Sequence, residues 1–198
     1  MDIVTTTDFQ GRMDLTGVWR FQADPEGQGE ALAYFEPGHD LRFWAEVDLP
    51  RIVDHCHPAI ASYEGPAWYA RDVRLPPAGP DRHWVLRLEG VNYRAAVWLE
   101  GRRLGEQAGG FLPLEWAIEE MPGAGPTRRL VLCVDNRRRA GDVPGLRRGW
   151  RPQGGVLREL YFESRPAVEI RDPIPRADSG GRLSVRFTVA GVKAGTGP

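Results

Sequence analysis

The sequence predicts an all-β fold, a sandwich of short strands connected by many turns. Apolar runs of strand length recur along the chain and are interrupted by glycine and proline, of which there are 24 and 17 among 198 residues. This content is typical of β-sandwiches, whose strands are joined by tight turns. No stretch keeps apolar residues at the helical period of about 3.6 over several turns. These observations together favour strands throughout.

Six strands are expected before residue 165, at 17–23, 67–75, 84–89, 94–99, 128–135 and 156–163. The strand at 128–135 is apolar on both sides. Leu130, Leu132 and Val134 share one face, and Val131 and Cys133 share the other. Because successive side chains of a strand point to opposite faces, both faces of this strand must be covered. We therefore expect it in the middle of the packed structure.

Two local features are expected between these strands. A hairpin should turn at Glu100 and Gly101, where glycine suits the positive φ of a two-residue turn and glutamate is less usual than asparagine. One or two helical turns are expected at 115–121, because a Pro-Gly pair follows that would end a helix.

The composition of the chain changes near Asp172. Residues 172–181 are rich in proline, glycine and aspartate, as linkers and turns are. Over 183–189 apolar residues then alternate with polar or small ones, which predicts one half-buried strand. Since a single strand cannot fold alone, it either joins the first domain or begins a second one.

Composition also limits the partners and the compartment. The net charge of −1, from 26 basic and 27 acidic residues, gives no field that would attract nucleic acid or a membrane surface. Cys56 and Cys133 cannot form a disulfide framework. No apolar run approaches the ~20 residues that span a bilayer, and the first residues lack the layout of a signal peptide. We expect a cytoplasmic protein without nucleic-acid or membrane partners.

Three stretches carry distinctive residues in a fixed order. The first reads Gly-Pro-Ala-Trp-Tyr-Ala-Arg at 65–71. The second reads Leu-Glu-Gly-Val-Asn-Tyr-Arg-Ala-Ala-Val-Trp-Leu-Glu-Gly at 88–101. The third reads Val-Asp-Asn-Arg at 134–137 and continues as Trp-Arg-Pro-Gln-Gly-Gly-Val-Leu-Arg-Glu-Leu at 150–160. Together these stretches resemble the N-terminal domain of family 2 glycoside hydrolases, the β-galactosidase and β-glucuronidase family, over roughly residues 15–172.

The resemblance implies a jelly-roll, galactose-binding-domain-like sandwich at 1–172, followed at 173–198 by a linker and the first strand of an immunoglobulin-like domain. In full-length members a TIM barrel follows and holds two glutamates, the carboxylate pair that a retaining glycosidase needs. The acid/base glutamate follows an asparagine, whereas Asn92 and Asn136 here precede tyrosine and arginine. We therefore expect a non-catalytic domain of a β-glycosidase without a cofactor. Its partners would be the missing downstream domains, a carbohydrate substrate and, as a further role open to it, a second copy of the chain.

The resemblance also implies a sugar-contacting loop just before the last strands of the domain. The matching segment is 142–150, where Asp142 is the only carboxylate and would accept hydrogen bonds from sugar hydroxyls. Arg148 would offer a charged fork and Trp150 an apolar ring face. The alternative is that Trp150 packs in the core, that the arginines are solvated, and that Asp142 pairs with a neighbouring arginine.

Two further clusters favour simpler interpretations. His55, Cys56 and His57 have metal-ligand side chains, but zinc needs three or four convergent ligands, so a plain loop with no metal is expected. The arginines at 137–139, with Arg147 and Arg148, are expected to be solvated loop residues rather than a nucleic-acid site. Alternative functions that remain open are a free-standing carbohydrate-binding module and a purely structural or interaction domain.

Overall fold

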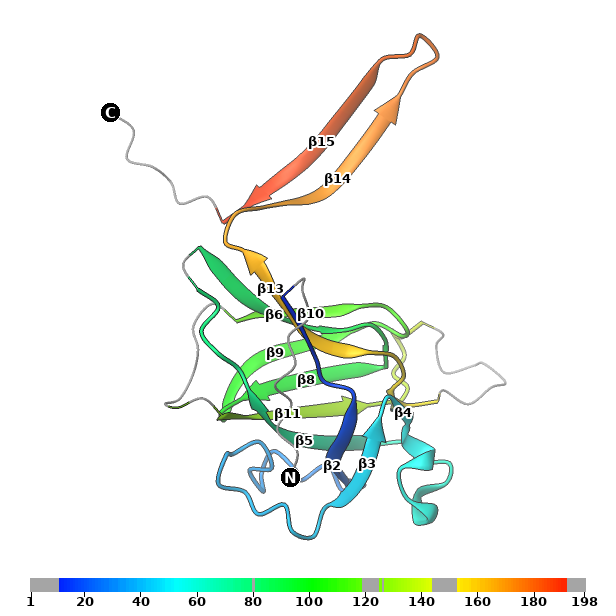
Figure 1. Ribbon diagram of the computed structural model, residues 1–198. Helices are drawn as coiled ribbons and strands as arrows, with labels where there is room; N and C mark the ends of the chain where they lie inside the picture. Colours follow the sequence, from blue (N-terminus) through cyan, green and yellow to red (C-terminus); the bar gives the residue numbers. More distant parts are fainter. Residues whose placement is uncertain (1–10, 80, 119–124, 126, 144–152, 192–198) are drawn as a thin grey trace.

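The computed structural model describes residues 11–79, 81–118, 125, 127–143 and 153–191, which form a two-layer β-sandwich with a projecting hairpin (Figure 1). One layer is a four-stranded sheet in the order β1 (Arg12–Asp14), β13 (Leu160–Pro166), β6 (Arg82–Leu88) and β10 (Leu114–Ile118). The other is six-stranded, in the order β3 (Ala45–Leu49), β2 (Gly17–Ala23), β5 (Pro66–Arg74), β11 (Thr127–Asp135), β8 (Arg94–Leu99) and β9 (Arg102–Ala108). The all-β sandwich fold predicted from the sequence is confirmed.

The space between the two layers is filled by one apolar cluster. From the six-stranded sheet, Leu130, Leu132 and Val134 of β11 point into it, and from the other sheet Phe162 of β13 does so, all with at most 1% exposure. Full burial of one such side chain contributes ~1.5–3 kcal/mol. As predicted, β11 lies in the interior of its sheet, between β5 and β8.

A second apolar cluster covers the outer face of the six-stranded sheet. The segment 24–44 crosses this face and places Tyr34 5.6 Å from Trp68, and Phe35 5.5 Å from Trp98, measured between ring centroids. Trp68 and Trp98 also stack on each other at 5.2 Å. The central strands β5, β11 and β8 are therefore buried on both faces, which explains why β11 is apolar at every position from Leu130 to Val134.

The predicted hairpin is confirmed as the connection between β8 and β9. Glu100 and Gly101 have φ of 51° and 75°, the two positive angles that a type I′ turn requires. Glutamate replaces the usual asparagine here, and its carboxylate accepts a hydrogen bond from the backbone N–H of Arg129 on β11. This contact ties the turn to the neighbouring strand.

The helical turns expected at 115–121 are wrong over 115–118, because residues 114–118 form strand β10; residues 119–121 lie outside the described residues. Leu114, Trp116 and Ile118 point into the core, whereas the intervening Glu115 and Ala117 do not. This period of two is that of a strand, and the burial it gives outweighs the local helix propensity. Helical structure in the described residues is limited to two short 3₁₀ turns, η1 (Val53–His55) and η2 (Pro58–Ile60).

The single strand expected at 156–163 is divided into two. β12 (Gly155–Val156) pairs with β4 (Arg51–Ile52) and β7 (Val91–Asn92) in a small sheet, whereas β13 joins the four-stranded layer. Between them, the backbone amides of Leu157 and Arg158 both donate to the carbonyl of Gly90, at 2.8 and 3.3 Å. The chain bends at this point and so changes sheets.

The last described strands, β14 (Glu169–Ala177) and β15 (Leu183–Ala190), form a hairpin that extends away from the sandwich (Figure 1). The linker expected at 172–181 is thus strand as far as Ala177, with a bulge between Arg171 and Ile174, and a turn only after it. The alternation predicted for 183–189 is confirmed as a strand, and its apolar face, with Phe187 half exposed, has no cover among the described residues. The domain division predicted at residue 172 falls inside β14 and stays a prediction.

Candidate functional site

The loop that connects β11 to β12 begins at Asn136, whose side chain is 2% exposed and fixes the start of the loop. Its Oδ1 accepts a hydrogen bond from the backbone N–H of Gly65 at 2.8 Å. Its Nδ2 donates to the carbonyl of Tyr63 at 2.9 Å. One buried amide therefore holds the loop to the segment that leads into β5, using both its donor and its acceptor.

The other end of the loop is fixed beside β7. The Nδ2 of Asn92 donates to the carbonyl of Gln153 at 2.8 Å, and Asn92 is itself buried. The next residues enter β12, which pairs with β4 and β7 on its two sides. Both ends of the loop are thus anchored by asparagine side chains that belong to, or directly follow, sandwich strands.

Asp135, the last residue of β11, organises the first turn of the loop. Its Oδ1 accepts from the backbone N–H of Arg137 at 2.9 Å, and its Oδ2 accepts from the guanidinium of the same residue at 2.9 Å. Arg139 approaches Oδ2 at 3.4 Å, and Arg138 pairs with Glu64 at 3.2 Å. The three arginines of this segment are therefore each paired with a carboxylate of the same domain.

Asp142, the predicted sugar ligand, forms a two-pronged ion pair with Arg94 of β8. Its Oδ1 and Oδ2 accept from the two Nη atoms of Arg94, and Oδ2 also accepts from the backbone N–H of Arg139 at 2.8 Å. The side chains of Arg94 and Asp142 are only 12% and 7% exposed. Bidentate pairs of this kind are among the stronger hydrogen-bonded contacts in proteins. The pair holds the loop against the first residue of β8, at one end of the strands of the sheet.

The protonation of Asp142 follows from these contacts. Burial acts to raise the pKa of its carboxyl group, but the hydrogen bonds from Arg94 and from the amide of Arg139 outweigh burial and lower the pKa. Asp142 is therefore ionised at neutral pH. Tyr93 adds a further contact, because its hydroxyl accepts from the backbone N–H of Val143 at 3.2 Å.

A polar cavity of about 240 Å³ lies at the base of the loop. Trp68 and Ala96 line it, together with charged side chains, namely those of Asp24, Glu30, Arg94, Glu106, Asp135, Arg137 and Arg139. Carboxylates accept hydrogen bonds and guanidinium groups donate them, which is the combination that polyhydroxylated ligands need. The walls can therefore meet both the donor and the acceptor side of a hydroxyl group.

Of the three residues predicted to contact a sugar, only Asp142 belongs to the described part of the chain. Asp142 lies at the described base of the loop and has the arginine partner that the alternative interpretation expected. Arg148 and Trp150 lie outside the described residues. Arg94 and Asn136, which hold the loop, were not singled out from the sequence, although both belong to motif stretches. Their partners are 48 and 71 positions away, so spacing gave no signal.

The remaining clusters have structural roles. The Nδ1 of His57 accepts from the backbone N–H of Ala59 at 3.1 Å and so caps the 3₁₀ turn η2. Within the described ranges, no group of three or more histidine, cysteine, aspartate or glutamate side chains is placed to hold a metal ion. In the same part of the chain, no helix is long and apolar enough to cross a membrane.

We predict that Asp142→Ala accelerates tryptic cleavage after residues 137–139 about tenfold or more. The substitution removes the carboxylate that holds Arg94 and the amide of Arg139, and a charge-assisted contact of this kind is worth ~1.5–3 kcal/mol. Cleavage is followed by mass spectrometry under native conditions.

The matched control is Asp72→Ala, because Asp72 forms an ion pair of similar burial with Arg129, far from the loop. This variant should lose stability but keep the slow cleavage at 137–139. Equal acceleration in both variants would mean that Asp142 stabilises the whole domain and has no local effect on the loop.

The fold and the anchored loop together define the class: a jelly-roll β-sandwich domain with a polar cavity at one end of the sandwich. The family model described as "Glycosyl hydrolases family 2, sugar binding domain" matches residues 31–147. The chain therefore belongs to glycosyl hydrolase family 2, as its sugar binding domain.

Individual relatives agree with this assignment. Among curated proteins, the β-glucuronidase of Canis lupus familiaris is 29% identical over 136 residues, which cover 63% of this chain and 21% of the relative. The β-glucuronidase of Rattus norvegicus is 30% identical over 133 residues, which cover 62% and 20%. The chain thus spans about a fifth of the length of the curated relatives it matches.

Solved structures show the same fold. The β-glucuronidase of Lactobacillus rhamnosus superimposes with a TM-score of 0.74 at 26% identity, covering 94% of this chain and 34% of that one. The β-glucuronidase of Ruminococcus gnavus in complex with uronic deoxynojirimycin gives a TM-score of 0.77 at 20% identity, covering 97% and 37%.

Proposed function

We propose that this chain is the non-catalytic N-terminal domain of a β-glycosidase of the β-glucuronidase type, and that its β11–β12 loop lines the sugar site of a barrel domain outside this chain. The observation that carries the proposal is the double anchoring of the loop by Asn136 and Asn92. An anchored loop at the end of a rigid sandwich can present side chains at a fixed position to a neighbouring domain.

In this proposal Asp142 acts mainly by holding the loop. Three of the hydrogen bonds that its carboxylate can accept come from Arg94 and Arg139, which leaves little capacity for a sugar hydroxyl. Direct contact with the sugar falls to Arg148 and Trp150, as a guanidinium fork and a ring face. Asp142 as a direct sugar ligand stays the alternative.

The hairpin β14–β15 supports a larger parent protein. One of its faces carries Ile170, Val185, Phe187 and Val189, which are between 45% and 63% exposed. A two-stranded hairpin with an open apolar face is marginal in water and gains stability when further strands cover it. We propose that it begins the immunoglobulin-like domain that the family resemblance implies.

The two cysteines support a reducing, cytoplasmic setting for the protein. Both are free thiols, and burial raises the pKa of Cys56 to about 11 and that of Cys133 further. Thiols with raised pKa values carry little thiolate at neutral pH and are poor nucleophiles. They serve packing and not chemistry.

We predict that, in the enzyme that carries this chain, Asp142→Ala and Arg94→Ala each raise the KM for p-nitrophenyl β-D-glucuronide about tenfold. Either change breaks the ion pair that holds the loop. Such a charge-assisted contact is worth ~1.5–3 kcal/mol, and the lower end of this range corresponds to about tenfold in KM. A smaller change is expected in kcat, since the reacting carboxylates belong to the barrel. Steady-state kinetics measure both.

Asp72→Ala is again the control and should leave KM unchanged. A much larger effect of Asp142→Ala than of Arg94→Ala would indicate that Asp142 contacts the sugar directly. The 198-residue chain by itself should hydrolyse neither this substrate nor the corresponding β-galactoside. Turnover by the isolated chain would contradict the proposal.

A further inference from the structure

The turn 109–113, which connects β9 to β10, lies at the same end of the sandwich as the β11–β12 loop. Arg94, the first residue of β8, pairs with Asp135 at the end of β11 on one side and with Ala108 at the end of β9 on the other. The last residues of both strands therefore lie on either side of one residue of β8, and the two connections leave the sandwich together. We call this end of the sandwich the loop end.

Large apolar side chains are exposed at the loop end. Phe111 and Leu112 of the turn are 53% and 62% exposed, and Val143 of the loop is 78% exposed. Tyr93 lies between the turn and the loop. Its hydroxyl accepts from the backbone N–H of Val143 at 3.2 Å, and a Cβ atom on Gly110 would lie 3.3 Å from its ring. Phe111, Leu112 and Val143 thus belong to neighbouring segments, and we refer to them as the apolar patch.

The backbone of Phe111 is strained for a bulky residue. Its φ is 65°, in the left-handed region that glycine adopts freely and phenylalanine rarely. The turn is nevertheless fixed, because the amide of Phe111 donates to the carbonyl of Val91 at 3.0 Å and that of Gly109 donates to the carbonyl of Tyr93 at 3.1 Å. The ring is half exposed, so burial offsets little of this strain. Backbone strain of this kind is typical of positions at which a side chain makes a functional contact.

The polypeptide leaves the sandwich at the opposite end. Leu88 pairs with Leu114, the first residue of β10, and with Leu160, the first residue of β13, so β13 begins at the loop end. β13 then runs for seven residues to Pro166, after which the chain enters β14 (Figure 1). At ~3.3 Å per residue this exit is about 20 Å from the loop end. A domain that follows β13 is therefore joined to the sandwich at the end away from the loop.

We infer that the apolar patch docks on the barrel domain of the same polypeptide and holds the loop end against it. The inference rests on the proposed function, in which the β11–β12 loop lines a sugar site on that domain. Because the covalent connection is at the other end, a fixed position of the loop requires a non-covalent contact at the loop end. The side chains of the patch carry no polar group, so they suit an apolar protein surface and not a sugar hydroxyl.

The chain outside this domain is long enough to supply such a surface. This chain spans about a fifth of the length of the curated relatives it matches, so most of the polypeptide of such an enzyme lies outside it.

The test compares the alkylation of thiols placed in the patch, by Phe111→Cys and by Val143→Cys, in the 198-residue chain and in the enzyme that carries it. Iodoacetamide is the probe, and peptide mass spectrometry gives the rate at each position. We expect each thiol to react at least about tenfold more slowly in the enzyme, because docking leaves it accessible only during local opening. Burial raises the pKa of Cys56 to about 11 and that of Cys133 further, so the two natural thiols of the chain react slowly.

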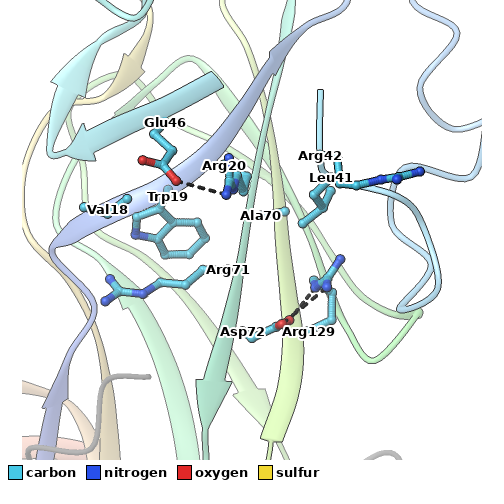
Figure 2. Close-up of a pocket in the computed structure, with 10 residues that line it drawn as sticks. All are labelled: Val18, Trp19, Arg20, Leu41, Arg42, Glu46, Ala70, Arg71, Asp72 and Arg129. Carbon is cyan, nitrogen blue, oxygen red and sulfur yellow. Dashed lines mark hydrogen bonds and ion pairs between the residues drawn. The ribbon is translucent and has the colours of Figure 1, made fainter. Parts of the chain in front are cut away.

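Val18→Cys is the matched control. Val18 is 48% exposed and lines a cavity of about 420 Å³ on the outer face of the six-stranded sheet (Figure 2). It is the second residue of β2, which runs in the same direction as β11 because both are antiparallel to β5. Val18 therefore lies away from the loop end, and its thiol should react at the same rate in the enzyme and in the 198-residue chain.

Phe111→Asn removes the ring without adding strain, because asparagine tolerates the left-handed region. The 198-residue chain with this substitution should keep its melting temperature. In the enzyme, Phe111→Asn combined with Val143→Cys should restore the fast alkylation seen in the 198-residue chain.

Equal alkylation rates of the patch thiols in the enzyme and in the 198-residue chain would overturn the inference. Slow alkylation that extends equally to Val18→Cys, or that persists at Val143→Cys when Phe111→Asn is added, would also overturn it. A shielded patch in an enzyme whose KM is unchanged by Asp142→Ala would support the docking and contradict the proposed role of the loop. An unshielded patch together with a raised KM in Asp142→Ala would overturn the docking alone.

Discussion

Trp68→Ala is expected to lower the free energy of unfolding by about 3–5 kcal/mol, the range for large aromatic side chains removed from a core. Trp68 is 1% exposed and lies between Trp98 and Tyr34. Its Nε1 donates to Asp24 at 3.0 Å, and the same carboxylate accepts the amide of Gly29 at 2.8 Å. The substitution therefore leaves a cavity and also loosens the start of the segment that covers the sheet.

Denaturant unfolding followed by far-UV circular dichroism measures this loss. Trp68→Phe keeps most of the ring packing but removes the donor to Asp24, so a smaller loss of ~1.5–3 kcal/mol is expected. Phe43→Ala is the negative control, because Phe43 lies in the same covering segment and is 87% exposed. If Trp68→Ala cost no more than Phe43→Ala, the outer cluster would not be part of the cooperative core.

The parts of the fold that the sequence predicted well are those in which one strand carries its own signal. β11 was placed in the middle of a sheet because Leu132 and Cys133 continue an apolar run on both faces, and burial on both faces is what a central strand requires. The turn at Glu100 and Gly101 was predicted for a similar reason, since its φ angles are a local property of two residues.

The errors arose where distant contacts decided the structure. Residues 115–118 form a strand because β10 pairs with β6 and places Trp116 in the core. The stabilisation from this pairing and burial depends on a distant strand, so the local sequence does not indicate it. Likewise the bend after Val156 depends on the carbonyl of Gly90, 67 positions earlier than Leu157. Sequence spacing contains no information on pairings of that kind.

In the candidate site, too, local features could be predicted from the sequence and distant contacts could not. The family resemblance directed attention to the loop and to Asp142, but the residues that hold the loop became visible only in three dimensions. Asn136 is a buried amide at the end of an apolar strand, and a polar residue at such a position usually has a partner in the fold. A polar residue at this position was the one signal in the sequence that could have identified Asn136. It indicates a residue that anchors the loop and not one that contacts a sugar.

Gly155→Ala is expected to lower the free energy of unfolding by about 3–5 kcal/mol, because two separate costs combine at this position. Gly155 has a φ of +113°, which side chains rarely adopt, and β12 passes close to β4 there. A Cβ atom would lie 2.6 Å from the carbonyl oxygen of Arg51 and 2.8 Å from the amide nitrogen of Val53. Both atoms belong to the backbone, so no side-chain rotation can relieve the overlap.

Two further glycine-to-alanine variants separate these costs in the same unfolding assay. Gly17 has a φ of +102° with nothing within 4 Å of an added Cβ, so Gly17→Ala measures the backbone strain alone, about 1–3 kcal/mol. Gly141 has open space and an ordinary φ, so Gly141→Ala should change stability by less than about 1 kcal/mol. The extra loss of unfolding free energy in Gly155→Ala, compared with Gly17→Ala, then measures the cost of the close approach of β12 to β4.

The same variant should affect the loop. Because Gln153, two residues before Gly155, anchors the loop, a variant that forces these strands apart must also displace that anchor. If Gly155→Ala and Gly17→Ala lost equal stability, the two strands would have room to separate, and the end of the loop would not be rigidly held.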